Sequence, residues 1–274
     1  MTIIAVARDQ LTDLRHRRAV LAITIAAVLL AIGAVIQYII LKKLMGGGFT
    51  PPGMEEEEQL QFQAALAAGT TGMETFLYAV VSFAGVILSL VVFSTLISGE
   101  RARGTIHWVL ARPLSPAQLL LGKWLGACAM MLIYTALISV ILVGFAFLAE
   151  RSMTTSAIYA CLLMFPKFVL VGSVALVLAM LMPPPVAGVL AYFAGAGIFH
   201  TLAKYLAPWP WLRTVFTGIN YLLPNYGAFS PYLRFLLGKD PDPVRVLLLT
   251  LYAVGYSAVM LLLAIAAFRR RDVA

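Results

Sequence analysis

Long apolar runs separated by short polar segments form the main pattern of the chain. The runs cover residues 19–41, 75–97, 121–149, 157–182, 186–206 and 246–268. Each run is long enough to cross a hydrocarbon core, which takes about 20 residues of helix. Helices are favoured over a barrel because lipid leaves no backbone group unpaired and the runs are not short alternating strands. The pattern predicts an all-α membrane protein with six transmembrane helices, forming a single domain over residues 1–274.

The composition supports this class. Hydrophobic residues make up 62% of the chain and charged residues 12%, whereas soluble domains are about one quarter charged. The first run follows a charged leader, as the apolar part of a signal peptide would. It is longer than such a part, and Lys42 and Lys43 stand where a small-residue cleavage site would be needed. We therefore expect the first run to be a true span.

The distribution of basic residues predicts the orientation. Arginines are concentrated in the short segments before the first span, after the second span and after the last span. The loops on the opposite side are longer, and glutamates and aspartates dilute their basic residues. The positive-inside rule therefore places both termini in the cytoplasm, with the spans in the cytoplasmic (inner) membrane. Topology and contact with anionic lipid headgroups account for the net charge of +8 more simply than nucleic acid does.

Three segments outside the spans also have helical patterns. Residues 1–18 combine an apolar and a charged face, which predicts an amphipathic helix in the cytoplasmic interface, with a plain solvated leader as the alternative. Glu55–Glu58 would favour the start of a short helix through about Ala68, either a solvated cap or a cation site. Residues 207–245 alternate short apolar pieces with proline, which predicts re-entrant or interfacial helices before the last span. Rings suited to anchoring at the outer headgroups, or to contact with a substrate, are Trp209, Trp211, Tyr221, Tyr226 and Tyr232.

A polar, basic island lies between the second and third runs. It reads SGERARGTIHWVLARPLSPAQLLLGKWLG and covers Ser98–Gly126. Gly104-Thr105 offers a flexible break and an N-cap, and Arg112-Pro113 ends the short helix that follows. Ser115-Pro116 then suits the start of a new helix, because proline at the first helical position loses no hydrogen bond. The pattern predicts a short helix over Ile106–Leu110 that lies crosswise at the cytoplasmic membrane face.

This short helix has the composition of a docking element. It presents an apolar wedge that includes a tryptophan, and charged residues flank the wedge on both sides. An apolar anchor within a polar rim suits a groove on another protein. The alternative is an ordinary positive-inside loop with its tryptophan in lipid.

The island closely resembles the pattern of type-2 ATP-binding cassette (ABC) exporter permeases. That pattern is a glutamate, basic residues, Gly-Thr, an apolar stretch, Arg-Pro-x-Ser and then Gly-Lys-x-x-Gly. The leader ARDQLTDLRHRR, the six runs, the broken segment before the last run and the ending FRRRDVA are also similar. The resemblance covers nearly the whole chain, although only the island is specific by itself.

The resemblance implies a permease subunit of an ABC transporter, without a catalytic site or cofactor of its own. Its partners would be two copies of a separate ATP-binding subunit, which holds ATP and magnesium, and a second permease, either the same chain or a close paralogue. The loop 98–118 would carry the coupling helix into a cleft on the ATP-binding subunit. The implied contact residues are Glu100, Arg101, Arg103, Gly104, Thr105, Ile106, His107, Trp108, Val109, Leu110, Arg112 and Pro113, with Arg8, Asp9 and Asp13 of the leader as a second contact. Pro183-Pro184-Pro185 departs from the pattern, because many relatives carry basic or hydroxyl residues there, and this puts a further electrostatic contact in doubt.

The residues that would carry metal or covalent chemistry are not arranged for it. The three histidines, His16, His107 and His200, are far apart in sequence and have no ligand-spaced companions. Cys128 and Cys161 both fall inside predicted spans, which indicates neither a disulfide framework nor a metal site. No nucleophile elbow or acid–base pair is recognisable. We therefore expect the chain to be non-enzymatic by itself.

The end of the island holds two further weak motifs. Gly122-Lys123 lacks the upstream glycine of a phosphate-binding GxxxxGK loop and lies at a helix start. Gly122 and Gly126 have the GxxxG spacing that permits close helix contact, although chance explains so short a motif equally well.

Lys167 is the cation that lies well inside an apolar run, in the outer half of the fourth predicted span. Such residues usually face a bundle interior or a cavity, which predicts a contact with an anionic group of a transported molecule. The alternative is snorkelling to the outer headgroups. A stand-alone secondary transporter or channel is the competing functional class, but it would show several intramembrane polar groups and an internal repeat. A membrane-embedded enzyme is a third class, disfavoured by the missing catalytic cluster.

Overall fold

The protein folds as a bundle of helices. The computed structural model describes residues 3–16, 18–46, 56–97, 115–148, 154–195, 211, 214–215, 218, 223–229 and 242–272. Within these residues the regular elements are all helices, so the predicted all-α class is confirmed for this part of the chain. They are α1 (Ile3–His16), α2 (Arg18–Gly46), α3 (Glu56–Ser94), α6 (Pro116–Leu148), α7 (Thr154–Leu181), α8 (Pro184–Gly195), the 3-10 turn η1 (Tyr226–Phe229) and α12 (Pro243–Asp272).

Five of these helices are long and apolar enough to cross a membrane. Their spans are Val20–Gln37, Thr75–Ser94, Ala117–Phe145, Ala157–Leu181 and Pro243–Arg270. They coincide with five of the six predicted runs. The remaining run, 186–206, is described only through Gly195, as the 12-residue helix α8, which is shorter than a bilayer requires. The chain is therefore a multi-pass membrane protein, and the sixth span stays a prediction.

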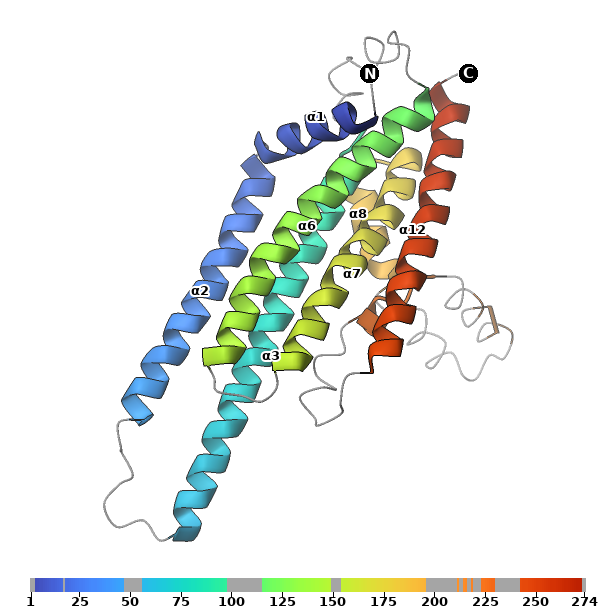
Figure 1. Ribbon diagram of the computed structural model, residues 1–274. Coiled ribbons are helices and arrows are strands. Elements are labelled where there is room, and N and C mark those ends of the chain that lie inside the picture. The colour runs from blue at the N-terminus through green and yellow to red at the C-terminus, as the bar shows by residue number, and fades with distance from the viewer. Residues whose placement is uncertain are drawn as a thin grey trace.

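Helix α3 differs from the expectation of a short helix through about Ala68 followed by a separate span. It is one continuous helix of 39 residues from Glu56 to Ser94. No proline interrupts this stretch, and its alanines favour helix strongly enough to offset Gly69 and Gly72, each of which costs about 1 kcal/mol. Figure 1 shows the Glu56 end of α3 extending past the neighbouring helices. The prediction of a separate short helix is wrong.

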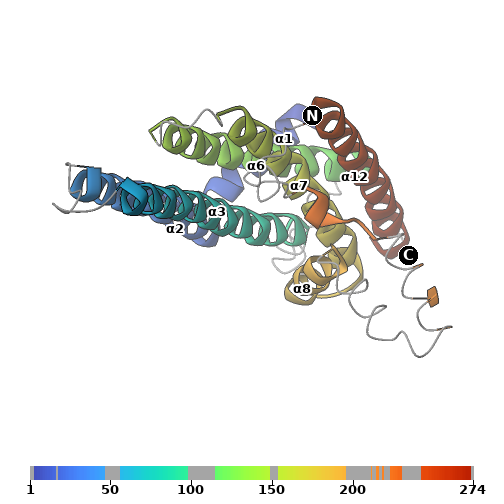
Figure 2. The same ribbon diagram turned by 90° about the horizontal axis from the view of Figure 1, so that it is seen from below.

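Helix α7 lies at the centre of the bundle. It packs against α3, α6, α8 and α12, and 72% of its span is buried. The spans of α2 and α12 are only 17% and 22% buried, and Figures 1 and 2 show them at opposite edges of the bundle. Burial thus divides the helices into an inner group and two edge helices whose apolar sides face outward.

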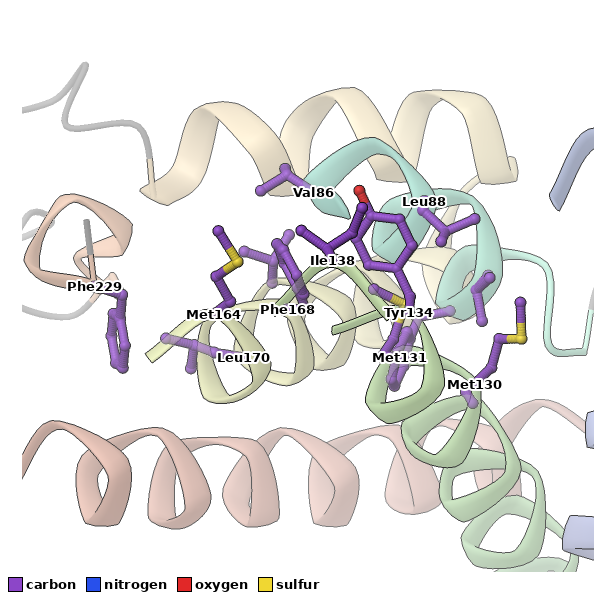
Figure 3. Packing of buried hydrophobic residues seen from close by; sticks show 14 of the residues in the cluster. Val86, Leu88, Met130, Met131, Tyr134, Ile138, Met164, Phe168, Leu170 and Phe229 are labelled. Carbon is purple, nitrogen blue, oxygen red and sulfur yellow. The ribbon is translucent and has the colours of Figure 1, made fainter. Parts of the chain in front are cut away.

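Aromatic rings and small residues join α3, α6 and α7 into one unit. The buried ring of Phe168 on α7 lies edge-on to Tyr134 on α6, with 5.9 Å between ring centroids (Figure 3). The same ring fills the space beside Gly85 on α3, where a Cβ atom would collide with it. Two hydroxyl groups donate to backbone carbonyls across the helices: Tyr134 to Val81 at 2.8 Å and Ser89 to Phe168 at 2.6 Å. Such close packing and interhelical hydrogen bonds stabilise helices in lipid, where hydrophobic burial contributes little.

Within the segment 207–245, the turn η1 packs against α7 of the bundle. Tyr226 of η1 is buried against Gly195 of α8, and its hydroxyl donates to the carbonyl of Ala191 at 3.1 Å. Burial raises the pKa of the Tyr226 phenol, so the group stays protonated as a donor. Tyr226 is therefore a packing residue, and its prediction as a headgroup anchor is wrong. Most of the expected re-entrant helices lie outside the described residues.

Candidate functional site

The leader of the chain forms the expected helix and lies against one end of the bundle. Figure 1 shows α1 crossing that end, and it packs on α6. Val6 and Gln10 are buried in the contact, whereas Arg8 and Asp9 are exposed and Asp13 is half-buried. The apolar face of α1 is thus covered at least in part by protein, and the charged residues predicted to contact a partner lie on the outer side.

Two glycines of α6 make this contact possible. A Cβ atom on Gly122 would lie 2.7 Å from the Cβ of Val6, and one on Gly126 would lie 2.6 Å from the carbonyl oxygen of Ala7. These distances are too short for real side chains, so any larger residue would push α1 away from α6. The GxxxG spacing, a weak signal in the sequence, is a close helix contact in the structure.

Lys123, between the two glycines, reaches the end of α3. Its side chain is buried, and Nζ donates to the carbonyl oxygen of Leu96 at 3.0 Å. Leu96 comes two residues after the end of α3 at Ser94, where carbonyls lack helical donors and the helix dipole favours a cation. Lys123 therefore caps α3 just before the island begins. Sequence reasoning used Lys123 to exclude a phosphate-binding loop and as part of the family pattern Gly-Lys-x-x-Gly, although a lysine in the first turns of a span was also a signal for such a contact.

Trp124 extends the same stretch to the central helix. Its indole Nε1 donates to the hydroxyl of Ser173 on α7 at 3.0 Å, and that hydroxyl donates to the carbonyl of Val169 at 2.8 Å. The five residues Gly122–Gly126, here called the GKWLG segment, thus contact α1, the end of α3 and α7. This segment joins the elements at one end of the bundle.

The start of α6 is fixed by a capping box. The backbone N–H of Gln118 donates to Ser115 Oγ at 3.2 Å, and the backbone N–H of Ser115 donates to Gln118 Oε1 at 3.1 Å. This reciprocal pair satisfies two donors that the first turn leaves free. The prediction of a helix that starts at Pro116 after a Ser115 cap is confirmed.

The predicted coupling helix itself falls in residues 98–114, outside the described residues. This segment contains all twelve of the implied contacts on the island: Glu100, Arg101, Arg103, Gly104, Thr105, Ile106, His107, Trp108, Val109, Leu110, Arg112 and Pro113. The structure describes its two attachment points, at Ile97 and Ser115. Both attachment points lie at the end of the bundle that carries α1, because Lys123 of α6 binds Leu96 and α1 packs on α6. These contact assignments stay predictions.

A comparison with known protein families decides what kind of bundle this is. The sequence profile of a family described as "ABC-2 family transporter protein" matches residues 4–172, more than half of the 274-residue chain. The chain belongs to the ABC-2 transporter family. The matched stretch runs from α1 through the GKWLG segment to Gly172 on α7. A search of curated proteins finds no match for the sequence.

Family membership confirms the resemblance drawn from the island. With its apolar spans, this ABC-2 protein is a membrane component of a transport system, and the family is not itself catalytic. Family members associate in general with an ATP-binding subunit. Among the described residues, no three His, Cys, Asp or Glu side chains come together in a way that could hold a metal ion.

Lys167 of this ABC-2 protein points into the bundle. It lies near the middle of α7, and its Nζ donates to Ser82 Oγ on α3 at 3.0 Å. Both side chains are buried, with 9% of Lys167 and 4% of Ser82 exposed. The geometry therefore differs from snorkelling, in which the ammonium would reach the membrane surface.

Proposed function

We propose that this ABC-2 protein is the permease subunit of an ABC exporter in the cytoplasmic membrane. Two copies, or one copy with a close paralogue, would pair with two separate ATP-binding subunits that hold ATP and magnesium, with both termini of the permease in the cytoplasm. The observation that carries the proposal is the family match over residues 4–172, which includes the whole island. Family membership favours this function over a stand-alone secondary transporter or channel.

The geometry around the island supports a docking role. The exposed Arg8 and Asp9 of α1 lie at the same end of the bundle as the attachment points of residues 98–114. A partner that binds the apolar wedge of the island would therefore meet the charged side of α1 as well. ATP-driven closure of two such partners would push on the island and tilt the spans.

Replacing Trp108 or Glu100 by alanine should weaken the complex with the ATP-binding subunit. A buried interface tryptophan contributes about 2 kcal/mol or more, so we expect the dissociation constant to rise by about 30-fold for Trp108→Ala. The measurement is co-purification and titration of the detergent-solubilised permease with its ATP-binding subunit. Trp211→Ala is the matched control, because Trp211 is 63% exposed and lies outside the island. Unaltered complex formation in both island variants would refute the docking assignment.

Lys167 is our candidate for a contact with an anionic group of the transported molecule. Replacing it by leucine should leave the fold intact, because an apolar residue of similar volume tolerates this interior at least as well as a cation. Loss of a charge-assisted hydrogen bond should reduce transport of anionic fluorescent amphiphiles into inside-out vesicles by about tenfold. Ser82→Ala, which removes only the neighbour that accepts the bond, should have a smaller effect. If Lys167→Leu changes neither transport nor ATPase stimulation, the residue has no role in the substrate path.

A further inference from the structure

Three separate contacts converge on the GKWLG segment at the base of the island. Gly122 and Gly126 seat α1, Lys123 binds the carbonyl of Leu96, and Trp124 binds Ser173. The segment therefore lies where movement of residues 98–114 would enter the bundle. Of these contacts, the one through Lys123 is made to the chain that leads directly into residues 98–114.

We propose that Lys123 is a positioning residue that transmits movement of residues 98–114 to α6 and α1. The inference rests on the proposed function, because it assigns to Lys123 the step that follows docking of the ATP-binding subunit. A pull on Leu96 is carried by the Lys123 ammonium into the first turns of α6. The close seat of α1 on Gly122 and Gly126 then makes α1 move with α6.

The backbone at the end of α3 leads into the carbonyl that Lys123 binds. The Thr95 N–H donates to Val91 at 3.3 Å in helical register, but the Leu96 N–H donates to Phe93 at 3.4 Å, one residue closer. The last turn of α3 therefore tightens as the helix ends. The carbonyl of Leu96 lies two residues beyond the end of α3 at Ser94, and Lys123 donates to it from α6.

The cost of burying Lys123 argues for a role in position rather than in stability. Its side chain is 4% exposed, and taking an ammonium out of water costs about as much as its partners return. A leucine or methionine would fill the same space without that cost. Unlike these residues, lysine has a long side chain with a hydrogen-bond donor at its end, which fixes the position of the Leu96 carbonyl.

The test compares Lys123→Met with Lys123→Arg and the control Leu125→Met, at an exposed position of the same segment. Spin labels are placed at Ser98, at the edge of the island, and at Ile4, which is 78% exposed on α1 and is not one of the predicted contacts with the ATP-binding subunit. Cys128 and Cys161 are first replaced by alanine, since both are free thiols. Label mobility is recorded with and without the ATP-binding subunit and ATP, together with the affinity of the complex and the melting temperature of the permease.

In the wild type, binding of the ATP-binding subunit with ATP should change the signals of both labels. In Lys123→Met the subunit should bind with unchanged affinity and the Ser98 label should still respond, but the response at Ile4 should fall at least fivefold. Lys123→Arg should restore most of it, and Leu125→Met should behave as the wild type. An unchanged Ile4 response in Lys123→Met would overturn the inference, and so would a melting temperature that falls together with the response, because Lys123 would then be merely structural. Failure of the subunit to bind the wild type would instead count against the proposed function.

Discussion

Replacing Phe168 by alanine should lower the free energy of unfolding by about 3 kcal/mol, the lower end of the cost of such changes in protein cores. Phe168 is completely buried between α3 and α6 and touches both Tyr134 and Gly85. In lipid the transfer of the ring contributes little, so most of the loss comes from the cavity and from the missing dispersion contacts. The measurement is unfolding by sodium dodecyl sulfate in mixed micelles.

The matched control is Phe147→Ala. Phe147 lies on α6 and is 74% exposed on the outside of the bundle, so its removal should change the free energy of unfolding by less than about 0.5 kcal/mol. Equal effects of the two changes would contradict the packing described for the centre of the bundle.

A second substitution tests the same contact from the side of α3. Gly85→Ala alone places a methyl group in the Phe168 ring and should cost about 1–3 kcal/mol by overpacking. In the Phe168→Ala background the methyl has room, so the same change should be neutral or stabilising, with a gain in helix propensity of up to about 1 kcal/mol. A change of sign between the two backgrounds is the expected result. Additive effects would show that the two residues do not share this space.

Replacing Gly126 by leucine should detach α1 from α6. The new Cβ would meet the backbone carbonyl of Ala7 at 2.6 Å, and no rotamer relieves a clash that involves the Cβ atom itself. Overpacking of this kind costs about 1–3 kcal/mol, so amide hydrogen exchange in α1 should accelerate by about 5- to 150-fold. The measurement is exchange read by mass spectrometry over residues 3–16.

Gly144→Leu is the control for this change. Gly144 lies on the same helix, and a Cβ atom there would meet nothing within 4 Å. Exchange in α1 should therefore stay at the wild-type rate. If Gly126→Leu also leaves hydrogen exchange in α1 unchanged, α1 does not depend on its contact with Gly126. The inferred transmission from Leu96 through α6 would then not reach α1.

Five spans followed directly from the length of the apolar runs, because the thickness of the bilayer imposes that length on any helix that crosses it. The start of α6 was equally predictable, since the capping box at Ser115 is made by residues three positions apart. The continuity of α3 was not predicted. The short helix was expected to end at about Ala68, but the local cost of Gly69 and Gly72 is small compared with the helical preference of the whole segment.

The candidate site was visible only in part. The island and its family pattern could be read from residue types, and the family match confirms the family, whereas the docking role of the island stays a prediction. The roles of Gly122, Lys123 and Gly126 could not be read in this way, because each depends on a partner from another helix. Lys123 contacts a carbonyl 27 positions earlier, and the two glycines contact α1, which lies at the start of the matched region.

The sequence by itself thus determined the class of protein, the positions of five helices and the family, because hydropathy, capping and the island motif are local properties of the chain. Only the tertiary structure decided which polar groups are satisfied inside the bundle and by what. Lys167 turns inward to Ser82 rather than to the membrane surface, and Lys123 turns to the end of α3. The physical reason is that a buried donor takes whichever acceptor the packing of the helices brings within about 3 Å, and that packing is set by residues distant in sequence.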